Sequence, residues 1–442
     1  MANETSHLDR PAVTGAAGDG RRFHVATLGC KLNQFDSACA ESMLRQGGYH
    51  STDQPAAAHV ILLNTCTVTA RADAEARKLA RRFRREAPSA RIVATGCFAE
   101  REPDALRELG VLDDVVPLSE RDRLGEALLG TSECSVAPLW LSRADRGRAY
   151  LRVQEGCHQA CSYCVIPSVR GPGLSTPAVR VIAELRQLAG AGVREVGLTG
   201  VNTGSWGRDL TPRATLAELL EEILDADLPL RIRLNSLEPR TVTGRVVSLM
   251  EAHPDRIVPH VQIPLQSGCD RTLARMARNY RTGQYEETVA RVVERVADVS
   301  IGADVITGFP GESERDFDET ARFVERLPVA YLHVFSYSVR PGTRAADLDD
   351  KVAPADVKRR TATLREIGAG KELSFRGRLL GREFPALTLD GTGRGGMRRA
   401  LTGNYVEALL PDDEAAAPGR IVPVRLAQFD EDGRTVLGEV AA

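Results

Sequence analysis

Cys157, Cys161 and Cys164 form a C-x3-C-x2-C motif. Three thiolates this close in sequence can converge on one metal centre, and iron–sulfur clusters are held by cysteine thiolates, ordinarily four for a 4Fe-4S cluster. Three would leave one iron open to another ligand. Structural zinc sites usually take four protein ligands, and His158, the local candidate for a fourth, adjoins Cys157 and would strain the geometry. The motif therefore favours an iron–sulfur cluster over zinc or three buried thiols.

A second set, Cys30, Cys66 and Cys97, is spread along the chain, and spacing alone does not separate ligands from bystanders. Each of the three, however, directly follows a predicted strand. Because the carboxyl ends of parallel strands lie on one edge of a sheet, where ligands bind, the three thiols should face one crevice. This placement predicts a second three-cysteine cluster.

The chain has nine cysteines, an odd number that fits a disulfide framework poorly. The remaining Cys39, Cys134 and Cys269 fall on a predicted helix, in a linker and at a helix start. We interpret them as bystanders.

Strands alternate with helices along most of the chain, which indicates βαβ units, parallel sheets and an α/β fold. The first alternation has expected strands at Phe23–Gly29, Val60–Thr65, Arg91–Gly96 and Asp114–Leu118. It ends near Gly130, and a linker follows over Thr131–Asp145. A second alternation starts at Ala149 and has expected strands at Tyr150–Gln154, Glu195–Leu198, Arg231–Asn235, His260–Pro264, Ile301–Ile306 and Tyr331–Phe335. Six such units predict an open, partial (β/α)6 barrel, with its chemistry in the loops after the strands.

From about Arg378 the pattern changes to short strand-like runs separated by Asp-Gly and Pro-Gly turns, which predicts a small β-barrel. Residues 1–20 are polar and small, without the apolar core of a signal peptide, and we expect a disordered tail. No apolar run reaches the roughly 20 residues that span a bilayer. With 58 basic and 60 acidic residues, no global basic field marks a nucleic-acid binder. These features predict a cytoplasmic protein without a membrane contact.

The C-x3-C-x2-C motif, with Tyr163 before its last cysteine, resembles that of the radical S-adenosylmethionine superfamily. The upstream cysteines and the small β-domain make the chain similar to one subgroup, the methylthiotransferases. The motifs closest to the branch that modifies N6-threonylcarbamoyladenosine in tRNA are T-L-G-C-K-L-N-Q (27–34), N-T-C-T-V-T (64–69), I-P-L-Q-S-G (263–268) and G-F-P-G-E (308–312). The isopentenyladenosine branch typically has methionine where Leu32 stands.

The resemblance implies three domains after the tail: a methylthiotransferase N-terminal domain (21–132), a radical S-adenosylmethionine core (143–372) and a TRAM-like β-domain (374–442). It implies two 4Fe-4S clusters, each with one open iron, and S-adenosylmethionine as cofactor. One cofactor molecule would methylate a sulfur on the upstream cluster. A second would be cleaved to a 5′-deoxyadenosyl radical that takes hydrogen from adenine C2, at position 37 next to the anticodon. A low-potential electron donor is needed, and the sulfur source stays unknown.

The alternatives are the isopentenyladenosine branch, a branch that modifies an aspartate of a ribosomal protein, and a non-catalytic iron–sulfur RNA-binding protein. No catalytic residue beyond the clusters is singled out. We expect cofactor contacts at later strand ends, from Gly200, Asn202, Ser236, Glu238, Gln266, Asp304 and Gly308.

The chain departs from the family at two places. Where superfamily members often carry Gly-Gly-Glu, it reads Leu198-Thr199-Gly200, so the cofactor contact there would rest on backbone. The arginines that tend to follow Arg170-Gly171 are missing, which removes an expected arginine contact from residues 172–177.

One predicted helix is strongly basic and offers phosphate contacts to a tRNA substrate. Its basic residues are Arg77, Lys78, Arg81, Arg82, Arg84 and Arg85. The alternative is an ordinary solvated face. In the C-terminal domain, where basic and acidic residues nearly balance, local groups such as Arg394, Arg398 and Arg399 are the candidates.

Overall fold

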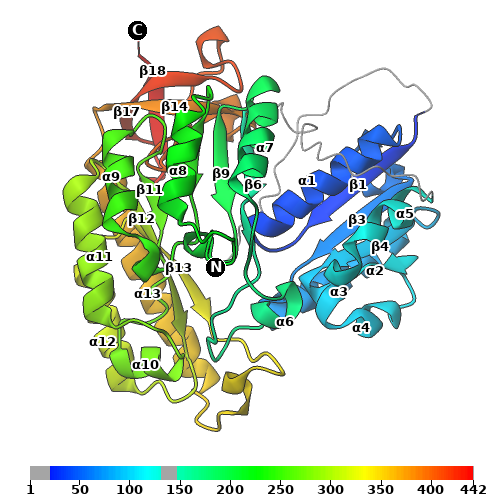
Figure 1. The fold of residues 1–442 in the computed structure, drawn as a ribbon, viewed down its shortest axis with the longest axis horizontal. Helices are drawn as coiled ribbons and strands as arrows, with labels where there is room; N and C mark the ends of the chain where they lie inside the picture. Colours follow the sequence, from blue (N-terminus) through cyan, green and yellow to red (C-terminus); the bar gives the residue numbers. More distant parts are fainter. Residues whose placement is uncertain (1–19, 131–146, 442) are drawn as a thin grey trace.

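The computed structural model describes residues 20–130 and 147–441. The predicted tail (except Gly20), the predicted linker at 131–145 and Cys134 lie outside these residues. Figure 1 shows a parallel-sheet domain at one side, a larger βα domain beside it and a small β-domain packed on one end of the latter.

The N-terminal domain is a five-stranded parallel sheet in the order β2-β1-β3-β4-β5. Its strands are β1 (Arg22–Thr27), β2 (His50–Ser51), β3 (Val60–Thr65), β4 (Arg91–Gly96) and β5 (Asp114–Val115). Every residue of β3 is buried, as its continuous apolar run requires of a strand covered on both faces. The helices are α1 (Lys31–Gln46), α2 (Ala70–Glu86), α3 (Cys97–Arg101), α4 (Pro103–Arg107) and α5 (Leu124–Leu129).

Six parallel strands form the second domain, in two three-stranded sheets ordered β10-β9-β6 and β11-β12-β13. They are β6 (Arg148–Arg152), β9 (Glu195–Thr199), β10 (Arg231–Leu234), β11 (His260–Gln262), β12 (Ser300–Thr307) and β13 (Tyr331–Ser336). The sheets adjoin where Ile232 bridges to Ile257. The predicted open barrel of six units is confirmed.

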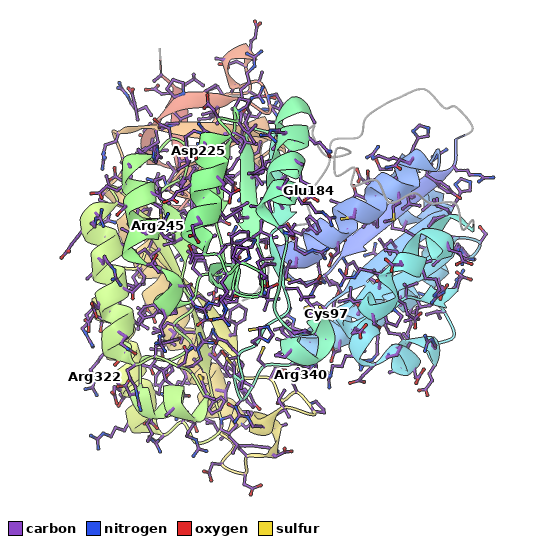
Figure 2. The ribbon with its side chains drawn as sticks, in the orientation of Figure 1. Cys97, Glu184, Asp225, Arg245, Arg322 and Arg340 are labelled. Carbon is purple, nitrogen blue, oxygen red and sulfur yellow. The ribbon has the colours of Figure 1, made fainter. Side chains whose placement is uncertain are left out.

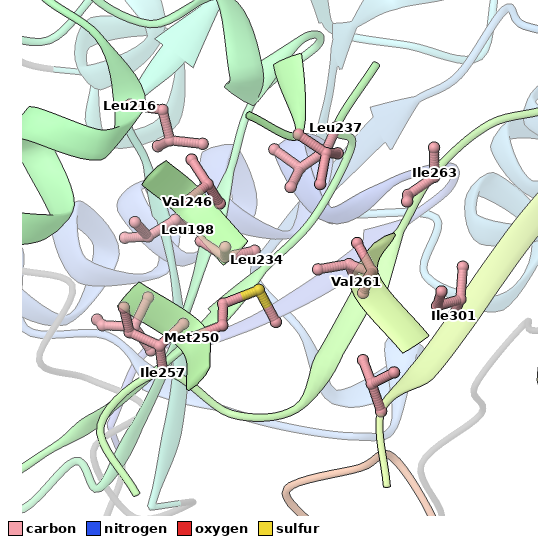
Figure 3. Close-up of a cluster of buried hydrophobic side chains, with 14 of the residues drawn as sticks. Leu198, Leu216, Leu234, Leu237, Val246, Met250, Ile257, Val261, Ile263 and Ile301 are labelled. Carbon is pink, nitrogen blue, oxygen red and sulfur yellow. The ribbon is translucent and has the colours of Figure 1, made fainter. Parts of the chain in front are cut away.

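The barrel core lies between these strands and the helices outside them, where Leu198, Leu234, Met250 and Val261 pack together (Figure 3). The outer helices are α7 (Ala178–Gly190), α8 (Leu216–Asp225), α9 (Gly244–Ala252), α11 (Thr282–Arg295), α12 (Glu314–Arg326) and α13 (Pro354–Gly377). Two short helices, α6 (Ile166–Arg170) and α10 (Asp270–Arg275), and the hairpin of β7 (Gln154–Glu155) with β8 (Leu174–Ser175) lie in its loops. No helix within 20–130 or 147–441 is both long and apolar enough to cross a membrane.

The C-terminal part is a closed barrel in the order β14-β15-β16-β18-β17, which confirms the predicted β-barrel. Its strands are β14 (Glu383–Thr392), β15 (Arg398–Thr402), β16 (Glu407–Leu410), β17 (Ile421–Phe429) and β18 (Val436–Val440). Closure leaves no strand edge unpaired and encloses a separate apolar core.

A buried ion cluster fastens this small barrel to the amino ends of β6, β9 and β10. The Glu195 carboxylate is fully buried and accepts hydrogen bonds from Arg231 Nε and Arg233 Nε, both at 2.8 Å. The same two arginines donate to the carbonyl oxygens of Pro385 and Gly403 in the small barrel. Their charges hold the pKa of Glu195 well below its usual value, despite burial, which alone would raise it. The β-domain therefore covers the end of the large barrel opposite the strand ends that carry the cysteines (Figure 1).

Candidate metal centre

Cys30, Cys66 and Cys97 lie at the carboxyl edge of three adjacent strands. Cys66 directly follows β3, Cys97 begins α3 directly after β4, and Cys30 caps α1 after β1. The parallel register pairs Thr27 with Asn64 and Thr65 with Gly96, which aligns the three strand ends. Cys66 and Cys97 are buried, whereas Cys30 is exposed. The sheet thus brings together three thiols that are up to 67 positions apart in the sequence, as their numbers show.

Two glycines make this close approach possible. Gly29 and Gly96 have φ values of 100° and 96°, which L side chains rarely adopt. A Cβ on Gly29 would lie 2.9 Å from Cys66 Sγ, and one on Gly96 would lie 2.4 Å from the Thr65 carbonyl oxygen. Asn33, fully buried, donates from Nδ2 to the carbonyls of Leu28 and Thr65 at 2.7 and 2.9 Å, which ties the first two cysteine loops together.

Gly96→Ala should damage the site selectively, because the new Cβ clashes with backbone and the positive φ adds strain of about 1–3 kcal/mol. We expect lower stability of the N-terminal domain and loss of iron from the Cys97 triad. Iron content and urea unfolding measure these effects. The control is Gly190→Ala at the end of α7, where nothing lies within 4 Å of the added Cβ. Equal behaviour of the two variants would contradict the assigned role of Gly96.

The other triad lies in the loop between β7 and α6, where Cys157, Cys161 and Cys164 are half-buried. A buried arginine from a distant loop reaches it, since Arg278 Nη1 donates to Cys161 Sγ at 3.2 Å. The same guanidinium is ion-paired to Glu238, which follows β10. The loop therefore contacts the barrel through this charged pair, and also through Ser162, whose backbone N–H and Oγ donate to the carbonyls of Met276 and Arg275.

Both triads offer thiolate donors, which are the ligands of iron–sulfur clusters. Within the described part of the chain, no three His, Cys, Asp or Glu side chains are arranged to hold one metal ion. In a 4Fe-4S cluster each thiolate binds its own iron, so the sulfurs need not converge on one atom. The choice between a cluster and zinc at either triad therefore stays a prediction.

Burial raises the pKa of Cys66 to about 12, of Cys97 to about 11 and of Cys164 to about 12. The charges of neighbouring cysteines of the same triad also raise each of these pKa values, although less than burial does. Because iron binds the thiolate, loading must release these protons.

Buried arginines join the N-terminal domain to the barrel. Arg170, at the end of α6, donates from Nε to Cys97 Sγ at 3.3 Å. Arg340, beyond β13, donates to the Thr67 carbonyl at 3.0 Å and to Asp73 at 2.6 Å, beside Cys66. Cys97 and Arg340 lie where the two domains meet (Figure 2).

Comparison with known proteins agrees with this arrangement. The family model described as "Uncharacterized protein family UPF0004" matches residues 22–117, and the one described as "Radical SAM superfamily" matches residues 151–324. The threonylcarbamoyladenosine tRNA methylthiotransferase MtaB of Aquifex aeolicus is 35% identical over 86% of this chain and 94% of its own length. The chain belongs to the radical S-adenosylmethionine methylthiotransferase family.

Two further relatives show how far the likeness extends. The tRNA-2-methylthio-N(6)-dimethylallyladenosine synthase of Chloroflexus aurantiacus is 32% identical over 92% of this methylthiotransferase and 89% of its own length. In fold, the chain is similar to the radical S-adenosylmethionine methyltransferase TsrM of Kitasatospora setae, with a TM-score of 0.55 and 15% identity over 95% of this chain and 85% of that one.

The cofactor contacts predicted for this methylthiotransferase stay predictions, but several positions carry independent signals. Ser236 and Gln266 hold φ values of 55° and 66° without being glycine, a strain common at functional sites. Asn202 is buried, and its Oδ1 has no hydrogen-bond partner among the described residues. Gly200 packs on Gln154. The Oε1 atom of Gln154 accepts a hydrogen bond from the backbone N–H of Asn202 at 2.9 Å. An unsatisfied acceptor in the loop after β9 suits a ligand that brings a donor.

Two predicted contacts have other partners in this methylthiotransferase. Asp304 accepts from Gln262 Nε2 at 2.9 Å and lies 3.1 Å from His333 Nδ1. At Gly308, a Cβ would lie 2.4 Å from Val357 of α13, so this glycine is required by helix packing. Its proposed approach to a ligand stays a prediction.

The basic helix α2 of this methylthiotransferase divides into two sets. Arg84 is occupied by structure, since it donates to the Val111 and Ala90 carbonyls and pairs with Asp113 at 2.5 Å. Arg77 lies over the Phe98 ring at 4.9 Å. The exposed members are Lys78, Arg81, Arg82 and Arg85. Of the six predicted residues, these four remain candidates for phosphate contacts, and Arg82 among them also pairs with Glu86 at 2.7 Å.

Sequence reasoning missed the arginines that complete both cysteine sites. Arg170, Arg278 and Arg340 act across long stretches of chain, and no local pattern marks them. The Arg170-Gly171 pair was visible, but its partner Cys97 could be identified only in the folded protein.

Proposed function

We propose that this chain is a cytoplasmic tRNA methylthiotransferase that adds a methylthio group to C2 of N6-threonylcarbamoyladenosine at position 37, next to the anticodon. It would hold two 4Fe-4S clusters and use S-adenosylmethionine. A low-potential electron donor and a sulfur source complete its requirements. The observation that carries the proposal is the link between the two cysteine triads: Arg170, at the end of the helix that follows one triad, donates to Cys97 of the other.

The cluster on Cys157, Cys161 and Cys164 would supply an electron to S-adenosylmethionine, and the one on Cys30, Cys66 and Cys97 would hold the sulfur to be methylated. The chain's own residues would bind S-adenosylmethionine and orient it. Glu238 and Arg278, ion-paired beside Cys161, offer one carboxylate and one guanidinium to a cofactor that carries one ammonium and one carboxylate. Asn202 adds an unsatisfied acceptor at the end of β9.

The choice of nucleoside rests on the motifs and on the name of the Aquifex aeolicus relative. Nucleoside analysis of tRNA from a deletion strain tests it directly. Loss of the methylthio form of N6-threonylcarbamoyladenosine supports the proposal. Loss of methylthio-isopentenyladenosine, or of a modified aspartate on a ribosomal protein, assigns the chain to another branch. Intact clusters without cleavage of S-adenosylmethionine under strong reductant would indicate a non-catalytic RNA-binding protein.

We expect α2 to contact tRNA phosphates through its exposed basic residues. Changing Lys78, Arg81, Arg82 and Arg85 together to glutamine should weaken tRNA binding and flatten its salt dependence by about one unit of log–log slope per lost contact. The matched control is Arg245→Gln with Arg326→Gln, two exposed arginines on the barrel helices. The measurement is affinity against salt concentration. An unchanged slope would remove α2 from the interface.

The TRAM-like role of the C-terminal barrel in RNA binding rests on the resemblance. Its candidate arginines are already paired with acids: Arg394 with Asp430 at 3.1 Å and Arg398 with Asp412 at 2.5 Å. Arg399 likewise pairs with Glu407. An RNA phosphate would have to compete with these carboxylates, so we assign the larger electrostatic share to α2.

A further inference from the structure

Arg170 is a buried cation in direct contact with a proposed cluster ligand. It ends α6, the helix that follows the Cys157–Cys164 loop, yet its Nε donates to Cys97 Sγ at 3.3 Å, 73 positions away in the other domain. Its side chain is only 1% exposed. Because arginine does not deprotonate in proteins, this contact places a permanent positive charge beside the sulfur.

The two terminal nitrogens of the Arg170 guanidinium also donate hydrogen bonds. Nη2 donates to Asn33 Oδ1 at 2.7 Å and to Asp36 Oδ2 at 2.8 Å. Nη1 donates to Glu155 Oε1 at 2.8 Å. These contacts fix the plane of the group and leave Nε directed at Cys97. A simple ion pair between domains would need one acidic partner, whereas Arg170 also has a sulfur as a partner.

We propose that Arg170 is a positioning residue that raises the reduction potential of the cluster held by Cys30, Cys66 and Cys97. The inference rests on the proposed function, since it needs a cluster at that triad. Reduction adds negative charge to a cluster, and a nearby cation in a poorly screened site favours the reduced form. An N–H···S hydrogen bond to a cluster sulfur also tunes the potential.

Substitutions at Arg170 and at its neighbour Asp36 should shift the reduction potential in opposite directions. Removing its charge by Arg170→Gln should lower the potential. Removing the charge of Asp36 by Asp36→Asn should raise it, because less of the Arg170 charge is then compensated. Arg121 is the matched control: it pairs with Glu155 at 2.9 Å, as Arg170 does, but no contact between Arg121 and a cysteine is found in the described parts of the chain. Arg121→Gln therefore measures the effect of a lost charge without the sulfur contact.

The experiment uses the full-length chain with Cys157, Cys161 and Cys164 changed to alanine, so that the remaining cluster gives the only signal. This parent should hold about four irons per chain. Potentiometric titration followed by electron paramagnetic resonance then compares the parent with the three variants. We expect a lower potential for Arg170→Gln, a higher one for Asp36→Asn, and for Arg121→Gln a shift clearly smaller than that of Arg170→Gln.

Equal potentials in the parent and Arg170→Gln, with iron retained, would overturn the inference, as would equal shifts for Arg170→Gln and Arg121→Gln. If Arg170→Gln fails to hold iron, Asp36→Asn decides: a potential that does not rise overturns the inference. A parent that holds no iron contradicts the proposed function itself and the inference with it. Iron content and potential thus separate the two failures.

Discussion

Changing Cys30, Cys66 and Cys97 together to alanine should halve the iron content of the reconstituted protein, from about eight to about four irons per chain. The variant should still cleave S-adenosylmethionine under reductant, because the Cys157–Cys164 loop keeps its contacts with the barrel, where Arg278 donates to Cys161 Sγ and Met276 O accepts from the Ser162 backbone N–H. It should form no methylthiolated product. The reciprocal variant of Cys157, Cys161 and Cys164 should also hold about four irons but cleave no cofactor.

The controls are Cys39→Ala and Cys269→Ala, which alter the two described bystanders. Cys39 lies on α1 and donates to the Phe35 carbonyl, whereas Cys269 contacts Asp316 at 3.3 Å. Both variants should retain about eight irons. A control that loses as much iron as a triad variant would contradict the division of the cysteines, as would a triad variant that keeps all of its iron.

Glu195→Ala should be among the most destabilising substitutions in the barrel. Three arginines converge on this buried carboxylate, and its removal leaves Arg231 and Arg233 as uncompensated buried charges. Breaking a buried pair in this way costs about 3–5 kcal/mol. The small barrel should also loosen, since the same two arginines donate to its backbone.

Urea unfolding and limited proteolysis of the small barrel measure both effects. The control is Glu221→Ala, which removes an exposed pair with Arg245 and should cost at most about 1 kcal/mol. If the two variants are equally stable, the ion cluster does not contribute to the domain junction.

The elements that carry the cysteines could be predicted because their signals are local. The run Val60–Thr65 is continuously apolar up to its polar end, and the cysteine that follows it has to lie at the sheet edge. Strand ends were less accurate: β1 stops at Thr27, two residues before the predicted Gly29, because Gly29 turns the chain with a positive φ.

What could not be predicted depends on contacts between distant segments. Arg170 meets Cys97 and Arg278 meets Cys161 across 73 and 117 positions. Glu195 was expected only as the first residue of a strand, and nothing in its neighbourhood indicates that three arginines surround it. Chain polarity and periodicity predict where a strand ends, but not which distant side chain will neutralise a charge there.

The junction at Glu195 also sets the distance between the small barrel and the cysteine loops. It fastens the small barrel to the amino ends of strands whose carboxyl ends face the cysteine loops, so the length of a strand separates the two. For β9, with five residues, that is about 17 Å at roughly 3.3 Å per residue. An RNA that touches the small barrel while its reacting base lies at the cysteines must extend along the whole side of the large barrel.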